Sequence, residues 1–141
     1  MTDDKVDVLV IDDDDITAEM VERALMKVPG EFRVIAARDG VAGLEKLLGR
    51  ADASVDRPNI ILLDLNMPRM NGFEFLEAVR GSPELRDSVI FVLTTSDVET
   101  DRSSAYSWHV AGYMVKSSIG PKFAGLARLL GEYSSAVDLP V

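Results

Sequence analysis

The 141-residue sequence contains no cysteine, which excludes disulfide bonds and thiolate zinc sites and makes a reducing compartment the expectation. It also lacks a basic excess: 15 basic against 24 acidic residues give a formal charge of −9, which argues against binding to nucleic acid. The acidic start MTDDKVD is unlike a signal peptide, and every apolar run is shorter than the about 18 residues that span a bilayer. We therefore expect a cytoplasmic protein without nucleic-acid or membrane partners, with a core over residues 6–133 and a C-terminal tail over 134–141.

Apolar residues make up 47% of the chain and gather in short runs between helical patterns. The runs cover residues 6–11 (VDVLVI), 32–37 (FRVIAA), 59–64 (NIILLD), 89–94 (VIFVLT) and 112–116 (GYMVK). Three of them are nearly continuous Val, Ile and Leu, which is typical of strands buried on both faces. Four of the helical patterns carry one apolar stripe each. The alternation predicts one α/β domain over residues 1–141, with a five-stranded parallel sheet that is doubly wound.

Two helix starts are predicted from capping residues. SDVETDRSSAYSWHV offers Ser96 and Glu99 as a capping box, and its thin apolar stripe predicts a weakly held helix. The last helix, over the stripe from Phe123 to Tyr133, is predicted to have Pro121 in its first turn. Residues 51–59 are predicted to form the longest loop.

Polar residues follow four of the five strands. They are Asp12 and Asp13 after the first, Asp64 after the third, Thr94, Thr95 and Ser96 at the end of the fourth, and Lys116 at the end of the fifth. The second strand ends in Arg38, Asp39 and Gly40, which offer nothing comparable. Ligands of open parallel sheets bind outside the carboxyl ends of the strands, so we expect the four polar ends to form one site.

Three carboxylates in one cleft repel each other, and a hard divalent cation such as Mg²⁺ resolves that repulsion with oxygen ligands. An aspartate can serve as the nucleophile of phosphoryl transfer, while a lysine and a threonine can bind phosphoryl oxygens. Within the run of four aspartates, Asp14 or Asp15 is predicted to cap the first helix.

VLVIDDD, LLDLNMPRMNG, VLTTS and GYMVK, in this order and spacing, resemble the receiver domain of two-component response regulators. The resemblance covers residues 6–130 and implies the flavodoxin-like (βα)5 fold. It implies that Asp64 is the phosphoacceptor, that Asp12 and Asp13 are the acidic pair with Asp13 the direct Mg²⁺ ligand, and that the backbone carbonyl of Asn66 is a further ligand.

The resemblance also assigns roles around the phosphoryl group. Thr94 is implied to be the switch hydroxyl, Lys116 to bind the phosphoryl group, and Tyr113 to be the aromatic residue whose rotamer follows phosphorylation. Pro68 and Gly72 are implied to shape the loop after the third strand.

The resemblance also implies a single-domain regulator that accepts a phosphoryl group from a sensor histidine kinase. Such a protein catalyses only its own phosphorylation and dephosphorylation and acts through a downstream partner protein or through self-association. AYSWHVAGYMVKSS and VDLP are similar to stand-alone regulators that pair with bacterial phytochrome-type kinases. The apolar tail YSSAVDLPV is predicted to pack on the last helix or on a second copy in a homodimer.

One position departs from the family, which usually has Lys-Pro, often cis, after the fifth strand. Here Lys116-Ser117 stands there, so either the bond is trans or the site retains strain. Two other functions are alternatives. One is a metal-dependent phosphatase or nucleotide-binding enzyme, but the sequence contains neither of the loops G-x-x-x-x-G-K-[ST] and G-x-G-x-x-G that cradle a nucleotide. A docking module without phosphoryl chemistry does not need the full set of site residues.

Overall fold

The sheet has five parallel strands in the order β2-β1-β3-β4-β5, in a computed structural model that describes residues 5–49 and 60–140. The strands are β1 (Val6–Ile11), β2 (Phe32–Ala37), β3 (Ile60–Leu63), β4 (Ile90–Thr94) and β5 (Gly112–Val115). Each central strand sends alternate side chains to opposite faces: Leu9 and Ile11 enter one core cluster, while Val8 and Val10 enter the other. Burial on both faces explains the continuous apolar runs and confirms the predicted sheet.

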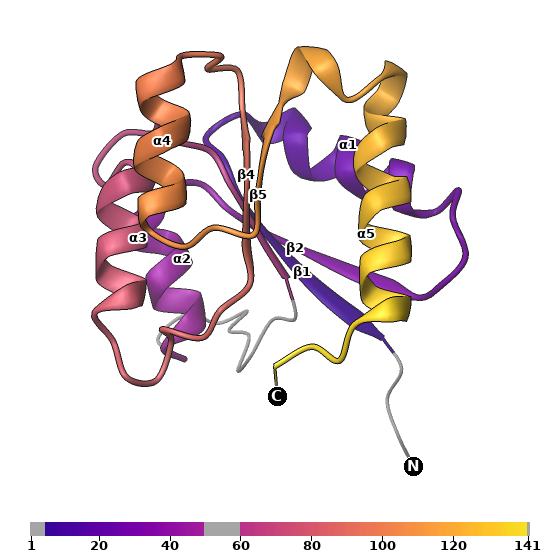
Figure 1. The fold of residues 1–141 in the computed structure, drawn as a ribbon. Coiled ribbons are helices and arrows are strands. Elements are labelled where there is room, and N and C mark those ends of the chain that lie inside the picture. Colours follow the sequence, from indigo (N-terminus) through magenta and orange to yellow (C-terminus); the bar gives the residue numbers. More distant parts are fainter. Residues whose placement is uncertain (1–4, 50–59, 141) are drawn as a thin grey trace.

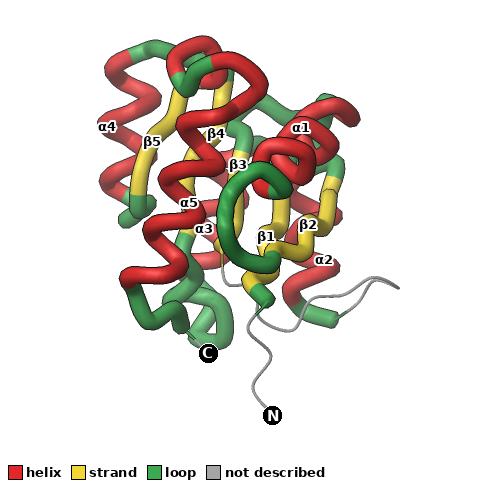
Figure 2. Tube along the Cα trace, turned by 90° about the vertical axis from the view of Figure 1, so that its right-hand side faces the viewer, coloured by secondary structure: helices red, strands yellow, loops and turns green. Residues whose placement is uncertain are grey.

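Helices cover both faces of this sheet (Figure 1). They are α1 (Asp15–Leu25), α2 (Gly40–Leu47), α3 (Gly72–Arg80), α4 (Glu99–Ser107) and α5 (Ala124–Ala136), with short 3₁₀ turns η1 (Lys116–Ser118) and η2 (Pro121–Phe123) before the last helix. Buried residues of α1 and α5 share one cluster, and those of α2, α3 and α4 share the other. Figure 2 shows α1 and α5 in front of the strands. The doubly wound α/β prediction is thus confirmed.

The helix starts confirm one capping prediction and correct two. Asp14 caps α1, because its carboxylate accepts a hydrogen bond from the backbone of Ile16 at 3.1 Å. The capping box at the fourth helix is wrong, since the N-cap is Val98, which has an extended backbone and makes no side-chain capping bond. Pro121 lies in η2 rather than in α5.

Two further predictions concern the fourth helix and the longest loop. The fourth helix buries Ala105 and leaves most of its surface to solvent, as its thin stripe predicted. The predicted loop 51–59 lies outside the described residues, as does the first residue of the run 59–64. None of the helices in residues 5–49 and 60–140 combines the length and the apolarity that a bilayer crossing requires.

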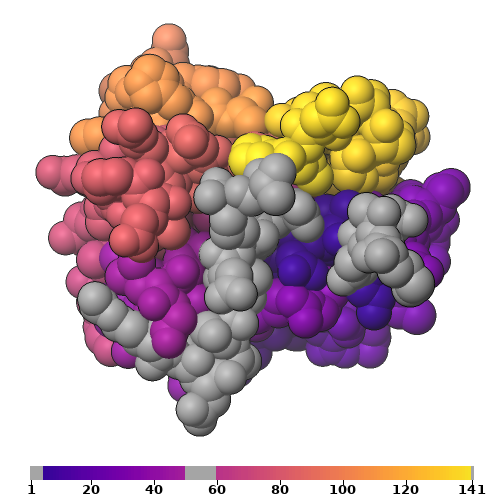
Figure 3. Space-filling model, turned by 90° about the horizontal axis from the view of Figure 1, so that it is seen from below, coloured from indigo at the N-terminus to yellow at the C-terminus, as the bar shows by residue number. Residues whose placement is uncertain are grey.

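The C-terminal residues pack on a core cluster to which α5 contributes. Helix α5 continues to Ala136, and Leu139 beyond it packs on the same core cluster as Tyr133. Seen from below, the last described residues lie against the body of the protein (Figure 3). Contact with a second copy stays a prediction.

Glycine is required at the start of α3, where the chain passes very close to the end of β3. The Gly72 amide donates a hydrogen bond to the Leu65 carbonyl at 2.9 Å. A Cβ at Gly72 would lie 2.6 Å from the backbone oxygen of Asp64. Because the obstructing atom belongs to the backbone, the clash cannot be relieved by a side-chain rotation.

We therefore expect Gly72→Ala to lower the free energy of unfolding by about 1–3 kcal/mol, since a close-packed neighbour must shift. Gly131→Ala is the matched control, because a Cβ there meets Val28 at an ordinary 3.5 Å in the interior of α5. This control should raise stability by about 0.4–1 kcal/mol. Urea unfolding measures both, and equal effects of the two substitutions would contradict the steric account.

Candidate functional site

The strand register gathers the predicted site residues at one edge of the sheet. Ile11 pairs with Leu63, and Leu63 pairs with Val92, so β1, β3 and β4 end close together. The backbone continues this alignment past the strands, because the Asp64 amide donates to the Ile11 carbonyl at 2.9 Å. The side chains that follow these strands therefore emerge side by side.

The three predicted carboxylates come together at this edge. Asp12, Asp13 and Asp64 each offer an oxygen, and the three oxygens lie within 4.8 Å of one another. Asp12 and Asp64 are buried, at 8% and 7% exposure, whereas Asp13 is exposed. Such a set of hard oxygen donors, closed on one side and open on the other, fits a divalent cation that keeps some of its waters.

The electrostatics of Asp64 reflect this crowding. Burial raises the pKa of Asp64 above its ordinary value, and the charge of Asp12 raises the pKa further. The nearby Thr94 hydroxyl and Lys116 ammonium act in the opposite direction on this pKa, to a smaller extent. Without a cation, the site therefore disfavours the ionised form of Asp64.

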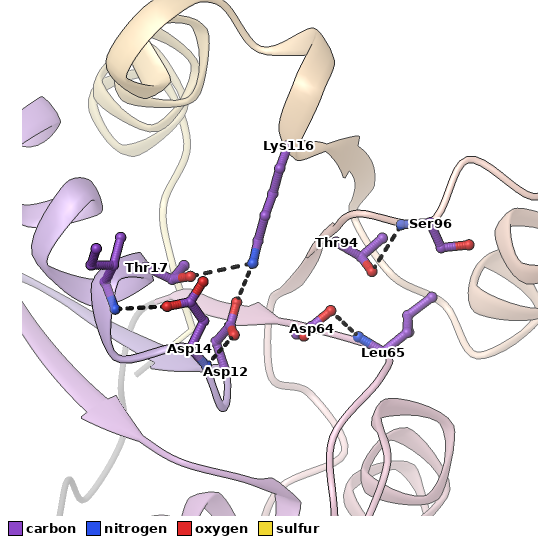
Figure 4. A network of polar contacts seen from close by, with 9 residues as sticks. Asp12, Asp14, Thr17, Asp64, Leu65, Thr94, Ser96 and Lys116 are labelled. Carbon is purple, nitrogen blue, oxygen red and sulfur yellow. Dashed lines mark hydrogen bonds and ion pairs between the residues drawn. The ribbon is translucent and has the colours of Figure 1, made fainter.

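Lys116 reaches into the site from the end of β5 and points toward α1. Its Nζ lies 2.6 Å from Asp12 Oδ2 and 3.2 Å from Thr17 Oγ1 (Figure 4). The Asp12 and Lys116 side chains are both largely buried, so solvent and salt screen this ion pair little. Thr17 is a buried residue of α1, and sequence reasoning did not identify its role as an acceptor for Lys116.

The Lys116-Ser117 peptide bond is trans, because the described residues contain no cis peptide bond. The chain turns directly after β5 into η1, which begins at Lys116. Of the two alternatives for this departure from the family, the trans bond is the one that the structure has.

Thr94 and Tyr113 are connected through Ser96. Thr94 is fully buried, and its hydroxyl accepts a hydrogen bond from the Ser96 amide at 3.3 Å. The Tyr113 hydroxyl donates to the Ser96 carbonyl at 3.0 Å, and the Ser96 hydroxyl donates to Asp101 of α4 at 2.6 Å. The Arg102 guanidinium lies 5.6 Å from the centre of the Tyr113 ring. Sequence reasoning had missed this connecting role of Ser96.

The loop between β3 and α3 carries Asn66 and Pro68, whose side chains are exposed. Arg69 of this loop contacts Asp39, which sequence reasoning did not count among the site residues because nothing comparable follows the second strand. Asp39 is buried, caps α2 by accepting the Ala42 amide at 2.8 Å, and binds Arg69 of the loop. An aspartate directly before a helical pattern is a signal for a cap. The pairing with Arg69 had no such signal.

Known proteins resemble the chain over most of its length. Residues 8–123 match the family model described as response regulator receiver domain. Response regulator Rcp1 of Synechocystis sp. (strain ATCC 27184 / PCC 6803 / Kazusa) is 34% identical over 111 residues, covering 78% of this chain and 76% of the relative. Chemotaxis protein CheY1 of Helicobacter pylori (strain ATCC 700392 / 26695) is 31% identical over 108 residues, covering 77% of this chain and 82% of the relative.

Solved structures agree with the fold. The Mn²⁺-bound form of response regulator Rcp1 superposes with a TM-score of 0.84 at 30% identity, over 96% of this chain and 99% of that one. The phosphorylated cyanobacterial phytochrome response regulator RcpA gives a TM-score of 0.86 at 27% identity, over 97% and 99% of the two chains. From the family match, the fold and the acidic edge of the sheet together, we conclude that the chain belongs to the response regulator receiver domain family, and is a signalling protein related to phytochrome response regulators.

Proposed function

We propose that the chain is a phosphorylation-operated switch in which Asp64 accepts a phosphoryl group from a histidine kinase. The observation that carries the proposal is the cluster of Asp12, Asp13 and Asp64 within 4.8 Å, beside the buried Thr94 and Lys116. An oxygen of the Asp64 carboxylate attacks phosphorus. The bond from phosphorus to the kinase histidine nitrogen breaks, and the nitrogen keeps the electron pair.

The metal in this proposal is Mg²⁺, held by the three carboxylates and by the backbone carbonyl of Asn66. When bound, the cation neutralises charge on the phosphoryl oxygens and on the crowded carboxylates. The oxygen donor set suits a hard cation, and the Mn²⁺-bound form of Rcp1 supports a divalent cation in this family.

Lys116 and Thr94 have complementary roles in this proposal. The Lys116 ammonium exchanges its contact with Asp12 for one with a phosphoryl oxygen on Asp64, which it binds as a point charge. The Thr94 hydroxyl donates to another phosphoryl oxygen. The receiver thereby catalyses its own phosphorylation and dephosphorylation, mostly through positioning and charge stabilisation.

The conformational change is transmitted from Thr94 to α4 through the contacts of Ser96. Movement of Thr94 toward the phosphoryl group breaks its contact with Ser96, which also binds Tyr113 and Asp101. Helix α4 buries little surface, so a change in these contacts is enough to shift its position between two states. Tyr113 changes rotamer with the same transition.

The relatives support a proposal for the partners. RcpA is a phytochrome response regulator, which supports a phytochrome-type histidine kinase as the phosphoryl donor for this chain. We propose that the chain works in the cytoplasm as a single receiver domain. Its output then passes to a downstream protein or to a homodimer through the surface near α4.

The first test is intact mass after incubation with Mg²⁺ and acetyl phosphate. We expect one phosphoryl adduct on the wild type, its loss when a chelator is added, and its loss in Asp64→Asn. Asp138→Asn, which changes an exposed aspartate in the tail, should be phosphorylated like the wild type. An adduct of equal yield on Asp64→Asn would refute the assignment of the phosphoacceptor.

A second test uses the raised pKa of Asp64. Because the pKa of the folded state lies above that of the unfolded state, protonated Asp64 contributes stability that is fully present below the unfolded pKa. This contribution is lost as the pH rises through the folded pKa. In chelator at neutral pH, Asp64→Asn should therefore have a larger free energy of unfolding than the wild type, and the difference should shrink toward about pH 4.

Asp39→Asn is the control, because its free energy of unfolding should change in the opposite direction. The hydrogen bonds from Arg69 lower the pKa of Asp39, so its contribution is present above the unfolded pKa and is lost as the pH falls through the folded one. This variant should be less stable than the wild type at neutral pH. Urea unfolding between acid and neutral pH measures both variants, and an Asp64→Asn protein that is no more stable than the wild type would count against the crowded site.

A further inference from the structure

Arg69 and Asp39 form a bidentate ion pair outside the acidic cluster. Arg69 Nε lies 2.7 Å from Asp39 Oδ2, and a terminal guanidinium nitrogen lies 3.0 Å from Oδ1. The carboxylate side chain is 7% exposed, whereas the arginine side chain is 59% exposed. The pair therefore consists of a buried anion covered by a guanidinium at the surface.

The buried carboxylate depends on this guanidinium. Asp39 also accepts a hydrogen bond from the Ala42 amide at the start of α2. If the guanidinium were removed, the carboxylate would lose both of its charge-assisted hydrogen bonds. The same contact holds the pKa of Asp39 below its ordinary value.

The ion pair joins two loops on either side of β1. In the sheet, β1 lies between β2, which precedes Asp39, and β3, which precedes Arg69. Asp12 and Asp13 emerge from β1 between these two loops. The contact therefore connects the segments that flank the acidic cluster.

A second contact next to the ion pair holds the same loop. The Gly40 amide donates to the Met70 carbonyl at 3.3 Å. The Met70 side chain lies so close that a Cβ at Gly40 would be 2.7 Å from its Cγ. The bond from Gly72 to Leu65 joins the two residues that flank the segment 66–71, so this segment forms a closed loop.

Arg69 has a backbone conformation that is uncommon for arginine. Its φ of +63° lies in the left-handed region, which favours glycine or asparagine over arginine. An arginine in this conformation needs compensation from its surroundings, and the bonds to Asp39 provide it.

We propose that Arg69 is a positioning residue for the divalent cation. Its contact with Asp39 holds the loop after β3 so that the backbone carbonyl of Asn66 faces the three carboxylates. The inference rests on the proposed function, because it assumes that this edge of the sheet binds a cation. Groups that orient a ligand contribute to metal affinity even though they do not touch the metal.

The test is a calorimetric titration of the metal-free protein with Mg²⁺, in the absence of any phosphoryl donor. Arg69→Asn keeps a residue that adopts positive φ and removes the guanidinium. We expect it to weaken Mg²⁺ binding about tenfold, at the lower end of the effects seen for groups that orient metal ligands. Arg69→Lys, which keeps the charge but not the bidentate fork, should lie between this variant and the wild type.

A double-mutant cycle separates the ion pair from other effects. Asp39→Asn keeps an oxygen for the cap on α2, and its combination with Arg69→Asn should weaken binding little more than either change alone. Arg33→Gln is the matched control. It removes another bidentate arginine–aspartate pair, with Asp7 at 2.9 Å, near the opposite ends of β1 and β2, and should leave Mg²⁺ affinity unchanged.

The carbonyl ¹³C shift of Asn66 distinguishes positioning from a general loss of stability. It should move on Mg²⁺ addition in the wild type and move less in folded Arg69→Asn or Arg69→Lys. Equal Mg²⁺ affinities for the wild type and both Arg69 variants would overturn the inference but leave the proposed function intact. A wild type that binds no Mg²⁺ would overturn the metal site and the inference with it.

Discussion

The confinement of three carboxylates at one edge of the sheet is the constraint on which the rest of this site depends. Asp12 and Asp64 follow strands that are buried on both faces, so neither can move away from the other without breaking the core. The repulsion has to be met by positive charge from elsewhere. Lys116 supplies part of it, at 2.6 Å from Asp12, and the open side at Asp13 leaves room for a cation.

The site has two halves that meet at Asp64. On one side, Lys116 is held by Asp12 and Thr17 near α1. On the other side, Thr94 belongs to the contacts of Ser96 with Tyr113 and α4. In the proposed switch, a phosphoryl group on Asp64 would offer new acceptors to both halves at once. The well-packed strands would keep their places while the weakly buried α4 adjusts, which is the arrangement that a two-state switch requires.

Much of the fold was predictable because the burial of each strand and helix requires a recognisable pattern of apolar residues in the sequence. Continuous Val, Ile and Leu in 6–11 and 89–94 indicated strands covered on both faces, and parallel strands bring their ends to one edge. The acidic cluster followed from that rule. The capping box at Ser96 and the helix start at Pro121 failed, because a capping motif does not report where the preceding chain stops being extended.

The sequence by itself determined the parallel sheet, the edge where the site lies and the residue types that meet there, since these depend on local patterns of apolar and polar residues. Only the tertiary structure decided which partner each charged group takes. Lys116 finds its acceptors 104 and 99 residues away, and Arg69 finds Asp39 30 residues away. Those choices depend on how helices and loops pack over the sheet, and long flexible side chains carry no periodic signal of where they end.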